Sequence, residues 1–447
     1  MTAPSERLAL EAFQRSASRV PAYRQILREA GADPGDVSRI EDFARLPVLT
    51  KAGTFQRFGV EQLCLDGQLG RLGSVLTSSG HSGVFAFGLT DAAALSPTVQ
   101  AMDDLLDLLF GVRSHPTLLI NCLPMGVKIP TQACTLAETS VRSDMVVGLV
   151  RAFGTHFAQV IMIGETAFIK TVLELGRRNE VDWTRLRLHI VVGEEPLAEN
   201  ARKYLERLAG LDLARPERGL VISSMGVAEI GLNLFCEVPP VAPLILLRRI
   251  LHERGALRQA VLGSVTTVPS IFTYDPQRIL VEFGSDGQLI LTTLDPGLRL
   301  PLVRYATGDR GGVLRVPPEV KGQLETAGLG WAMLASVPIV IIHGRGDHVP
   351  VADQPVTPEM VKEGLYHDPG AAEQTTANFR LSSDRERARI RVQLSPGVTP
   401  DRKLTERFAA GIAAYVRVPF EVTCERYDEF RSGMALDYER KFQYLGP

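Results

Sequence analysis

Short apolar runs alternate with amphipathic stretches from Ser74 to about Asp309. The runs are rich in β-branched residues, and each ends in or near a glycine or polar turn residue: TLLINCL, AQVIMIG, LRLHIVVG and GLVISSMG. This punctuation is typical of buried strands that lead into helices. The pattern predicts an α/β fold whose large N-terminal part layers parallel or mixed sheets with helices.

Individual elements can be predicted within this alternation. In PLAENARKYLERLAG, the side chains of Ala201, Leu205 and Leu208 share one helical face, and Gly210 follows as a stop signal. The first 50 residues also have a helical pattern, which Pro47 breaks. The stretch RILVEFGSDGQLILTTLD instead predicts two strands joined by a Ser-Asp-Gly turn.

The pattern changes after IVIIHGRGD, near residues 344–347. Thr357 and Pro358 mark the start of a helix, as a capping residue and a first-turn proline. An alternating strand (RARIRVQL), a helix (DRKLTERFAAGIAAYV) and another strand (FEVTCERY) follow. We therefore predict a large N-terminal domain, residues 1–343, and a small α+β C-terminal domain, residues 344–447, joined by a hinge.

Length and composition agree with a globular enzyme of two domains. The chain has 447 residues, 45% of them hydrophobic and 22% charged, and exceeds the size at which a single core stops growing. Its 49 basic and 51 acidic side chains give a net charge of −2, which offers no electrostatic reason to expect nucleic acid or an anionic membrane as partner.

The remaining compositional signals favour a cytoplasmic protein. The five cysteines lie far apart with no paired spacing, so they are expected to be reduced thiols and not a disulfide frame or zinc site. The N-terminal stretch lacks the apolar core of a signal peptide, and no run reaches the 18 apolar residues that suggest a membrane span.

The stretch SVLTSSGHSGVFAFGLT is the first candidate for chemistry. Between Thr77 and Gly83 it gathers hydroxyls and glycines, whose backbone N–H groups can converge on an anion such as phosphate. A Walker loop would need a lysine here, and a nucleophile elbow would need glycine where Val84 stands. Alone, the stretch is equally explained as an ordinary Ser/Gly loop.

Five further stretches occur in order with it: FARLPVLTK, IVVGEEPLAENARKYLERLAG, SSMGVAEIG, LPLVRYATGDRGGV and HGRGDHVPV. Together they resemble the adenylate-forming superfamily of acyl-CoA synthetases and carrier-protein adenylation domains. The leader VPAYRQILREAGADPGDVSRIEDFARLPVLTK is similar to the phenylacetate–CoA ligase branch in particular. The resemblance covers nearly the whole chain.

The resemblance implies a nucleotide site. Glu229 would hold Mg²⁺ against the phosphates, Asp309 would bind the ribose hydroxyls, Arg345 would supply charge nearby, and Asp347 would mark the hinge. His81, in the phosphate loop, is a candidate catalytic donor or a simple loop residue. The other implied nucleotide-binding residues are Thr77, Ser78, Ser79, Gly80, Ser82, Gly83, Gly193, Glu194, Glu195, Pro196, Ser224, Met225 and Gly226.

The chain departs from the family pattern at several positions. Met225 stands where an aromatic residue usually stacks on adenine, although a methionine can also cover a purine face. The family's S-G-K lysine aligns with Met434, which cannot stabilise the charge on the reacting carboxylate and α-phosphate. Lys441 is the candidate replacement, with a solvated surface charge as its alternative interpretation. Ala228, Phe85 and His348 are further departures.

Three functions remain open from the sequence. The first is ATP- and Mg²⁺-dependent activation of a small, aromatic carboxylic acid as acyl-AMP, followed by transfer to the thiol of coenzyme A or a carrier-protein phosphopantetheine. The second is ATP-independent transfer of an acyl group from CoA to an acyl carrier protein, which the loss of the lysine at Met434 would permit. The third is a catalytically degenerate binding partner. The sequence also leaves open whether the chain forms a homodimer.

Overall fold

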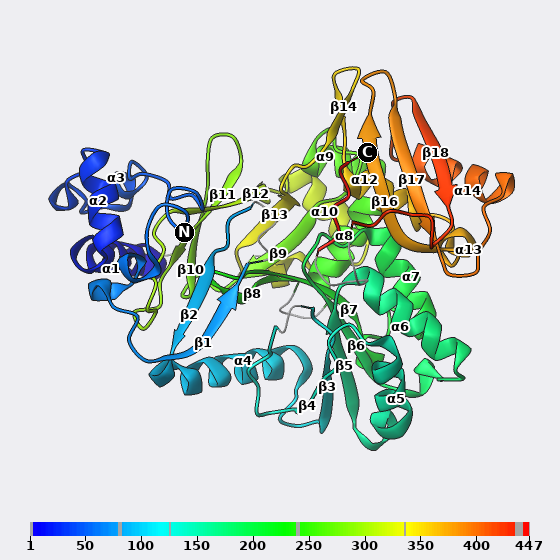
Figure 1. The fold of residues 1–447 in the computed structure, drawn as a ribbon, viewed down its shortest axis with the longest axis horizontal. Helices are drawn as coiled ribbons and strands as arrows, with labels where there is room; N and C mark the ends of the chain where they lie inside the picture. Colours follow the sequence, from blue (N-terminus) through cyan, green and yellow to red (C-terminus); the bar gives the residue numbers. More distant parts are fainter. Residues whose placement is uncertain are drawn as a thin grey trace.

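One mixed sheet of eleven strands organises the molecule, which we describe from a computed structural model that covers residues 3–78, 83–124, 127–237, 242–334, 337–433 and 441–446. The strand order is β10-β11-β12-β13-β9-β8-β7-β6-β5-β3-β4, and the elements can be followed in Figure 1. Its strands are β3 (Thr117–Asn121), β4 (Thr135–Glu138), β5 (Gln159–Gly164), β6 (Leu188–Val192), β7 (Val221–Val227), β8 (Gly231–Cys236), β9 (Ser270–Tyr274), β10 (Ile279–Phe283), β11 (Gln288–Thr293), β12 (Tyr305–Val313) and β13 (Ile339–Gly344).

The parallel half of this sheet is built from the apolar runs that the sequence predicts as strands. Strands β3 to β7 pair in parallel, and the inner strands are covered on both faces, so most of their consecutive side chains are apolar. Ile190 and Val192 pack towards α5, α6 and α7, whereas Val191 packs towards α4 and α8. These helices are α4 (Leu95–Phe110), α5 (Ser143–Phe153), α6 (Thr166–Arg178), α7 (Glu199–Ala209) and α8 (Pro243–Glu253).

The other half of the sheet is antiparallel, and the change occurs at β7. This strand pairs in parallel with β6 on one side and antiparallel with β8 on the other. The predicted hairpin is present as β10 and β11, paired antiparallel. The N-terminal helices α1 (Ala3–Arg19), α2 (Pro21–Glu29) and α3 (Ile40–Phe43) bury Phe13 and Tyr23 in a cluster that also contains Tyr305 of β12.

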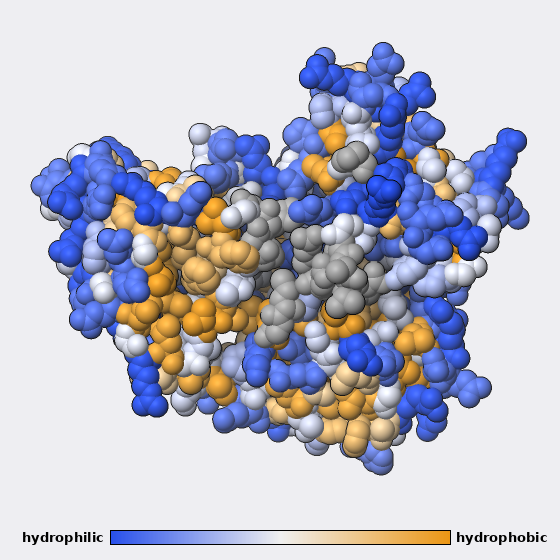
Figure 2. Space-filling view, in the orientation of Figure 1, coloured by the Kyte–Doolittle hydropathy of each residue, from blue (hydrophilic) through white to orange (hydrophobic). Residues whose placement is uncertain are grey.

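A two-stranded hairpin carries the predicted phosphate loop. Strands β1 (Leu72–Thr77) and β2 (Phe87–Asp91) pair antiparallel outside the large sheet. Gly88 of β2 lies so close to the segment after β7 that an added Cβ would be 2.3 Å from the carbonyl oxygen of Ala228. The hairpin is therefore held against the turn that contains Glu229. Figure 2 shows orange hydrophobic residues over this region, where Val75 and Phe85 are exposed.

The C-terminal part is a smaller α+β domain, as the sequence predicts. Its sheet consists of β16 (Thr375–Ser383), β17 (Ala388–Leu394) and β18 (Phe420–Glu425), packed on α12 (Pro358–Leu365) and α14 (Arg402–Ala413). The hydroxyl of Thr357 caps α12, and Pro358 opens it, as expected. Figure 1 shows this domain beside α6 and α7, in orange and red.

The remaining helices and strands are α9 (Gly255–Leu262), α10 (Pro318–Thr326), α11 (Trp331–Leu334), α13 (Pro369–Ala372), β14 (Val349–Val351) and β15 (Gln354–Val356). Within the described ranges, none of the helices combines the length and apolar character needed to cross a membrane.

Candidate active site

A cleft of about 350 Å³ lies beside the turn between β7 and β8 and is closed on one side by C-terminal residues. Most of the sequence-predicted site residues that the structure describes line it: Thr77, Ser78, Gly193, Glu194, Glu195, Pro196, Ser224, Met225, Gly226, Glu229, Asp309, Arg345, Asp347 and Lys441. They come from elements far apart in the sequence, so only the fold brings them together. The cleft has the size of an ordinary small-molecule site.

Five predicted residues cannot be placed. Ser79, Gly80, His81 and Ser82, the middle of the predicted phosphate loop, lie outside the described residues, as does Met434. The described ends of the loop differ in position. Ser78 lines the cleft, whereas Gly83 is exposed, has a positive φ of 77° and is not among the residues that line it.

Lys51 is a cation at the phosphate loop that the sequence interpretation missed. Its Nζ lies 3.2 Å from Oγ of Ser78 and 3.7 Å from Oε1 of Glu229. The signal was available, because Lys51 ends the stretch FARLPVLTK that contributed to the family resemblance. Lys51 places positive charge beside the loop, although the loop itself contains no lysine.

Glu229 is buried in the turn between β7 and β8. Its Oε1 accepts a hydrogen bond of 2.5 Å from the hydroxyl of Tyr305, a residue not singled out from the sequence. Within the described residues both contacts of the carboxylate, to Tyr305 and Lys51, fall on Oε1. Oε2 is therefore available to a further partner, and a carboxylate oxygen is a ligand that Mg²⁺ prefers.

Mg²⁺ would have to rely on this one carboxylate. The described part of the chain contains no group of three or more His, Cys, Asp and Glu side chains arranged to hold a metal ion. Mg²⁺ commonly binds through one or two carboxylates together with the phosphates of a substrate. Glu229 therefore fits an Mg²⁺ that arrives with a nucleotide, and not a resident metal.

Asp309 and Arg345 lie near one another across the cleft. Burial raises the pKa of the Asp309 carboxyl, and the nearby charge of Arg345 opposes this by lowering it. The charge of Lys441 also lowers the pKa of Asp309, which places the two groups in the same electrostatic environment. A half-buried carboxylate balanced by cations can accept hydrogen bonds from hydroxyl groups, as the ribose prediction requires.

The turn Gly193-Glu194-Glu195-Pro196 connects the cleft to the C-terminal domain. Lys441 donates a 2.7 Å hydrogen bond from Nζ to the carbonyl oxygen of Glu194. Oε2 of Glu195 accepts from Nζ of Lys362 at 2.7 Å and from the hydroxyl of Tyr444 at 3.0 Å. Lys441 is thus half-buried at the cleft, so its interpretation as a solvated surface charge is wrong.

A third glutamate lies behind this turn. Glu165 is buried at the start of α6, and burial, followed by the charges of Glu195 and Glu194, raises the pKa of its carboxyl well above the ordinary value. The lysines Lys362 and Lys441 act in the opposite direction. Burial also raises the pKa of the Glu194 carboxyl, so Glu165 and Glu194 both shift towards the neutral form, Glu165 strongly.

Met225 and Gly226 occupy an irregular part of β7. The register of the β7–β8 pair shifts between Met225 and Val227, where three residues of β8 face Gly226 alone, and Met225 is half-buried at the cleft. Nearby, Leu232 lines the cleft, whereas Leu244 and Leu247 are buried in the core.

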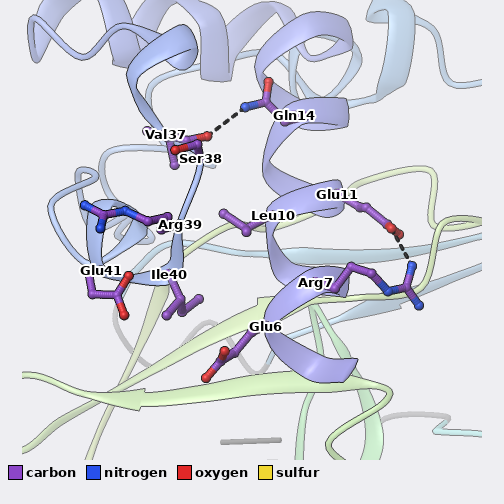
Figure 3. A pocket seen from close by; sticks show the side chains of 10 residues that line it. All are labelled: Glu6, Arg7, Leu10, Glu11, Gln14, Val37, Ser38, Arg39, Ile40 and Glu41. Atoms are coloured by element: carbon purple, nitrogen blue, oxygen red, sulfur yellow. Dashed lines mark hydrogen bonds and ion pairs between the residues drawn. The ribbon is translucent and has the colours of Figure 1, made fainter. Parts of the chain in front are cut away.

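A second hollow lies between α1 and residues 37–41, and Figure 3 shows it from close by. Charged side chains such as Glu6, Arg7 and Arg39 surround it, and Gln14 donates to the carbonyl oxygen of Val37 across it. None of the predicted site residues lines this hollow. The chemistry is therefore expected at the cleft beside β7.

No protein-family model and no curated protein sequence matches the chain. Solved structures do match it. A 2-hydroxyisobutyryl-CoA ligase in the postadenylation state, in complex with R3-HIB-AMP, superposes with a TM-score of 0.69 at 14% identity, covering 98% of this chain and 88% of the ligase. The same ligase with 2-HIB-AMP and CoA in the thioesterification state gives 0.55 at 15% identity, covering 100% and 90%.

The anthranilate CoA ligase AuaEII in complex with anthranoyl-AMP superposes with a TM-score of 0.52 at 14% identity, covering 83% of this chain and 66% of AuaEII. The chain therefore has the fold of the adenylate-forming enzyme superfamily, as the ordered sequence motifs predict. The phenylacetate–CoA ligase branch stays a prediction.

Proposed function

We propose that the protein activates a small carboxylic acid as acyl-AMP with Mg·ATP and transfers the acyl group to a thiol. The observation that carries the proposal is the convergence of Ser78, Glu229, Asp309, Arg345 and Lys441 in one cleft. These groups match the parts that nucleotide activation needs: phosphate donors, a metal carboxylate, a ribose carboxylate and fixed positive charge. The likeness in fold to ligases solved with acyl-AMP supports it.

In the first step the carboxylate oxygen of the acid attacks the α-phosphorus of ATP, an oxygen–phosphorus bond forms, and the bond to the β-phosphate breaks with release of pyrophosphate. In the second step a thiol attacks the acyl carbon, AMP leaves, and the thiol proton passes to solvent. We expect coenzyme A or a carrier-protein phosphopantetheine as the thiol, and an aromatic acid as the substrate.

The residues of the chain would supply most of the electrostatic stabilisation in the first step. Lys51 and Ser78 are placed to bind the phosphates, and Lys441 would lie beside the α-phosphate when the C-terminal domain is docked. Glu229 would hold Mg²⁺, which neutralises phosphate charge when it is bound. Asp309 would orient the ribose. Fixed charges of this kind act most strongly where water is excluded.

The alternative of an ATP-independent acyltransferase depends on the absence of a replacement for the lysine at Met434. The position of Lys441 at the cleft weakens that premise. Pyrophosphate release separates the two functions, because acyl transfer from CoA releases none.

The test is a panel of aryl and alkyl acids assayed for acid-dependent exchange of pyrophosphate into ATP, together with isothermal titration of ATP and AMP in the presence of Mg²⁺. We expect nucleotide binding by the wild type and its loss in Asp309→Asn, with exchange for at least one acid. Absence of both binding and exchange would overturn the proposal. Transfer from an acyl-CoA to a carrier protein without exchange would support the acyltransferase.

A further inference from the structure

One end of the cleft is apolar. The helix, strands and loop that form this end contribute no charged residue to the described lining of the cleft. Met102, Leu106, Ile129, Ile163 and Val191 line this end and belong to a single hydrophobic cluster. They come from α4, the loop after β3, β5 and β6. The charged residues that line the cleft come from other segments. A charged group bound here would lose its hydration without gaining a partner.

Asn233 is the polar exception at the border of this apolar end. It lies on β8 among the residues 232–234 that face Gly226 of β7 where the register of the pair shifts, and its backbone is left-handed, with a φ of 56°. Asparagine tolerates this conformation better than most residues, and bulges often redirect a side chain towards an active site. Its neighbour Ser224 pairs with Cys236, which packs against the same hydrophobic cluster.

The carboxamide of Asn233 is held in one orientation. The hydroxyl of Ser224 donates a hydrogen bond to Oδ1 of Asn233, and both residues line the cleft. Within the described residues, Nδ2 of Asn233 has no protein acceptor. Its two N–H groups are therefore available to a bound molecule.

We propose that Asn233 determines the acid specificity of the site by donating from Nδ2 to an oxygen on the body of the acid. The substrate class that follows is a neutral-bodied acid, apolar over most of its surface, with one hydroxyl, ether or keto oxygen besides the carboxylate. An acid without that oxygen leaves the donors of a half-buried amide unpaired. This inference rests on the proposed activation of an acid.

The test compares matched acids that differ by one oxygen. Benzoate, the three hydroxybenzoates, phenylacetate and the hydroxyphenylacetates are assayed for pyrophosphate exchange, with L-phenylalanine as the charged comparison. We expect wild type to prefer one hydroxylated acid over its parent by about tenfold in kcat/KM, the size of one hydrogen bond. Asn233→Gly, which keeps the left-handed backbone, should abolish this preference, so that kcat/KM for the hydroxylated acid falls to about that of the parent acid.

A second variant and a binding measurement distinguish a lost hydrogen bond to the acid from a folding defect. Asn233→Asp keeps the shape and can still accept from Ser224, yet it loses both donors; it can accept from a substrate hydroxyl but cannot donate to an ether oxygen, so it should lose any preference for a methoxybenzoate over benzoate. Isothermal titration of the same acids with α,β-methylene-ATP present reports binding without turnover. A preference unchanged in both variants, or a change confined to KM for ATP, overturns the inference. Absence of exchange with every acid counts against the proposed function instead.

Discussion

At the scale of single residues, Lys441 is the side chain that we propose in place of the lysine expected at residue 434. The family resemblance places a lysine at residue 434, where this chain has methionine. Seven residues later, Lys441 reaches the cleft and is oriented by the carbonyl oxygen of Glu194. A backbone carbonyl fixes the ammonium group without neutralising it, so its positive charge remains available to a substrate.

Replacing Lys441 by methionine should therefore lower the kcat of acyl-AMP formation by roughly 100-fold or more, because a preorganised charge commonly contributes several kcal/mol to lowering a barrier. Affinity for AMP should change much less. Single-turnover pyrophosphate release and AMP titration measure the two effects. Lys403→Met, at an exposed lysine of α14, is the matched control. Equal kinetics in both variants would show that Lys441 has no part in the chemistry.

Glu165 should make the stability of the protein depend on pH. Its pKa is raised in the folded protein, so the folded chain keeps a proton that the unfolded chain loses above the ordinary glutamate value of about 4.5. The free energy of unfolding therefore falls as the pH rises from about 4.5 towards the pKa of Glu165 in the folded protein. Glu165→Gln removes this loss, and we expect its melting temperature to exceed that of wild type by a few degrees at pH 8 but not at pH 4.

Thermal unfolding monitored by circular dichroism across this pH range checks the prediction. Glu421→Gln, at an exposed glutamate of β18, should follow wild type at every pH. A melting-temperature difference for Glu165→Gln that is constant with pH would contradict the assigned pKa shift.

At the scale of elements, the site depends on contacts between segments that are separate in the sequence. The β1–β2 hairpin pairs with no strand of the large sheet, and its position depends on the close approach of Gly88 to Ala228. This approach brings Ser78 and Glu229 within reach of the same ammonium group, that of Lys51. A side chain at position 88 would have to displace backbone, which is much stiffer than a side-chain tip.

Gly88→Ala should therefore raise KM for ATP several-fold and lower stability by about 1–3 kcal/mol, the usual range for an inserted methyl group in a packed region. The control is Gly148→Ala, because a Cβ at that position of α5 would meet nothing within 4 Å. The control should be neutral or slightly stabilising. Steady-state kinetics and urea unfolding give both quantities, and an unaltered KM in Gly88→Ala would argue against the hairpin contact.

Sequence reasoning recovered the elements better than their arrangement. The buried strands, the helix that ends at Gly210 and the β10–β11 hairpin follow from local patterns of apolar and turn residues. The pairing of β12 with β13 in the antiparallel half of the sheet does not follow from local patterns, because it depends on contacts between residues that are far apart in the sequence. The contacts of Tyr305 and Lys362 with the glutamates were missed for the same reason: Tyr305 stands in the stretch LPLVRYATGDRGGV and Lys362 in no motif, but only packing brings either side chain to its glutamate.

At the scale of the whole molecule, the C-terminal domain is attached through buried charged groups. Glu363 of α12 accepts hydrogen bonds from the backbone N–H groups of Glu199 at 2.7 Å and Asn200 at 2.9 Å, and so caps α7. The residue before α7, Ala198, has no side chain that could cap it. Nζ of Lys170 donates to the carbonyl oxygen of Thr375 at 2.6 Å.

The fold superposes better on the postadenylation state of 2-hydroxyisobutyryl-CoA ligase than on its thioesterification state.

If the small domain rotates between the two half-reactions about Asp347, the hinge expected from the sequence, then Glu363→Ala should favour the rotated state. A buried carboxylate that caps a helix typically contributes about 1–2 kcal/mol, so we expect acyl-AMP formation to slow by roughly 5- to 30-fold. Thioester formation from supplied acyl-AMP should change little or become faster. Rapid-quench measurement of each half-reaction tests this, with Glu406→Ala on α14 as control. Equal slowing of both half-reactions would point to a folding defect instead.

The two ends of the cleft are built from different parts of the chain, and this separation makes the protein a suitable starting point for directed evolution. Substitutions on α4, on β5 and at Leu232 and Asn233 would reshape the acyl-facing wall, whereas Lys51, Glu229 and Asp309 are carried by other segments. If the proposed function holds, a mutant library confined to the first group should yield altered acid selectivity while nucleotide binding is retained.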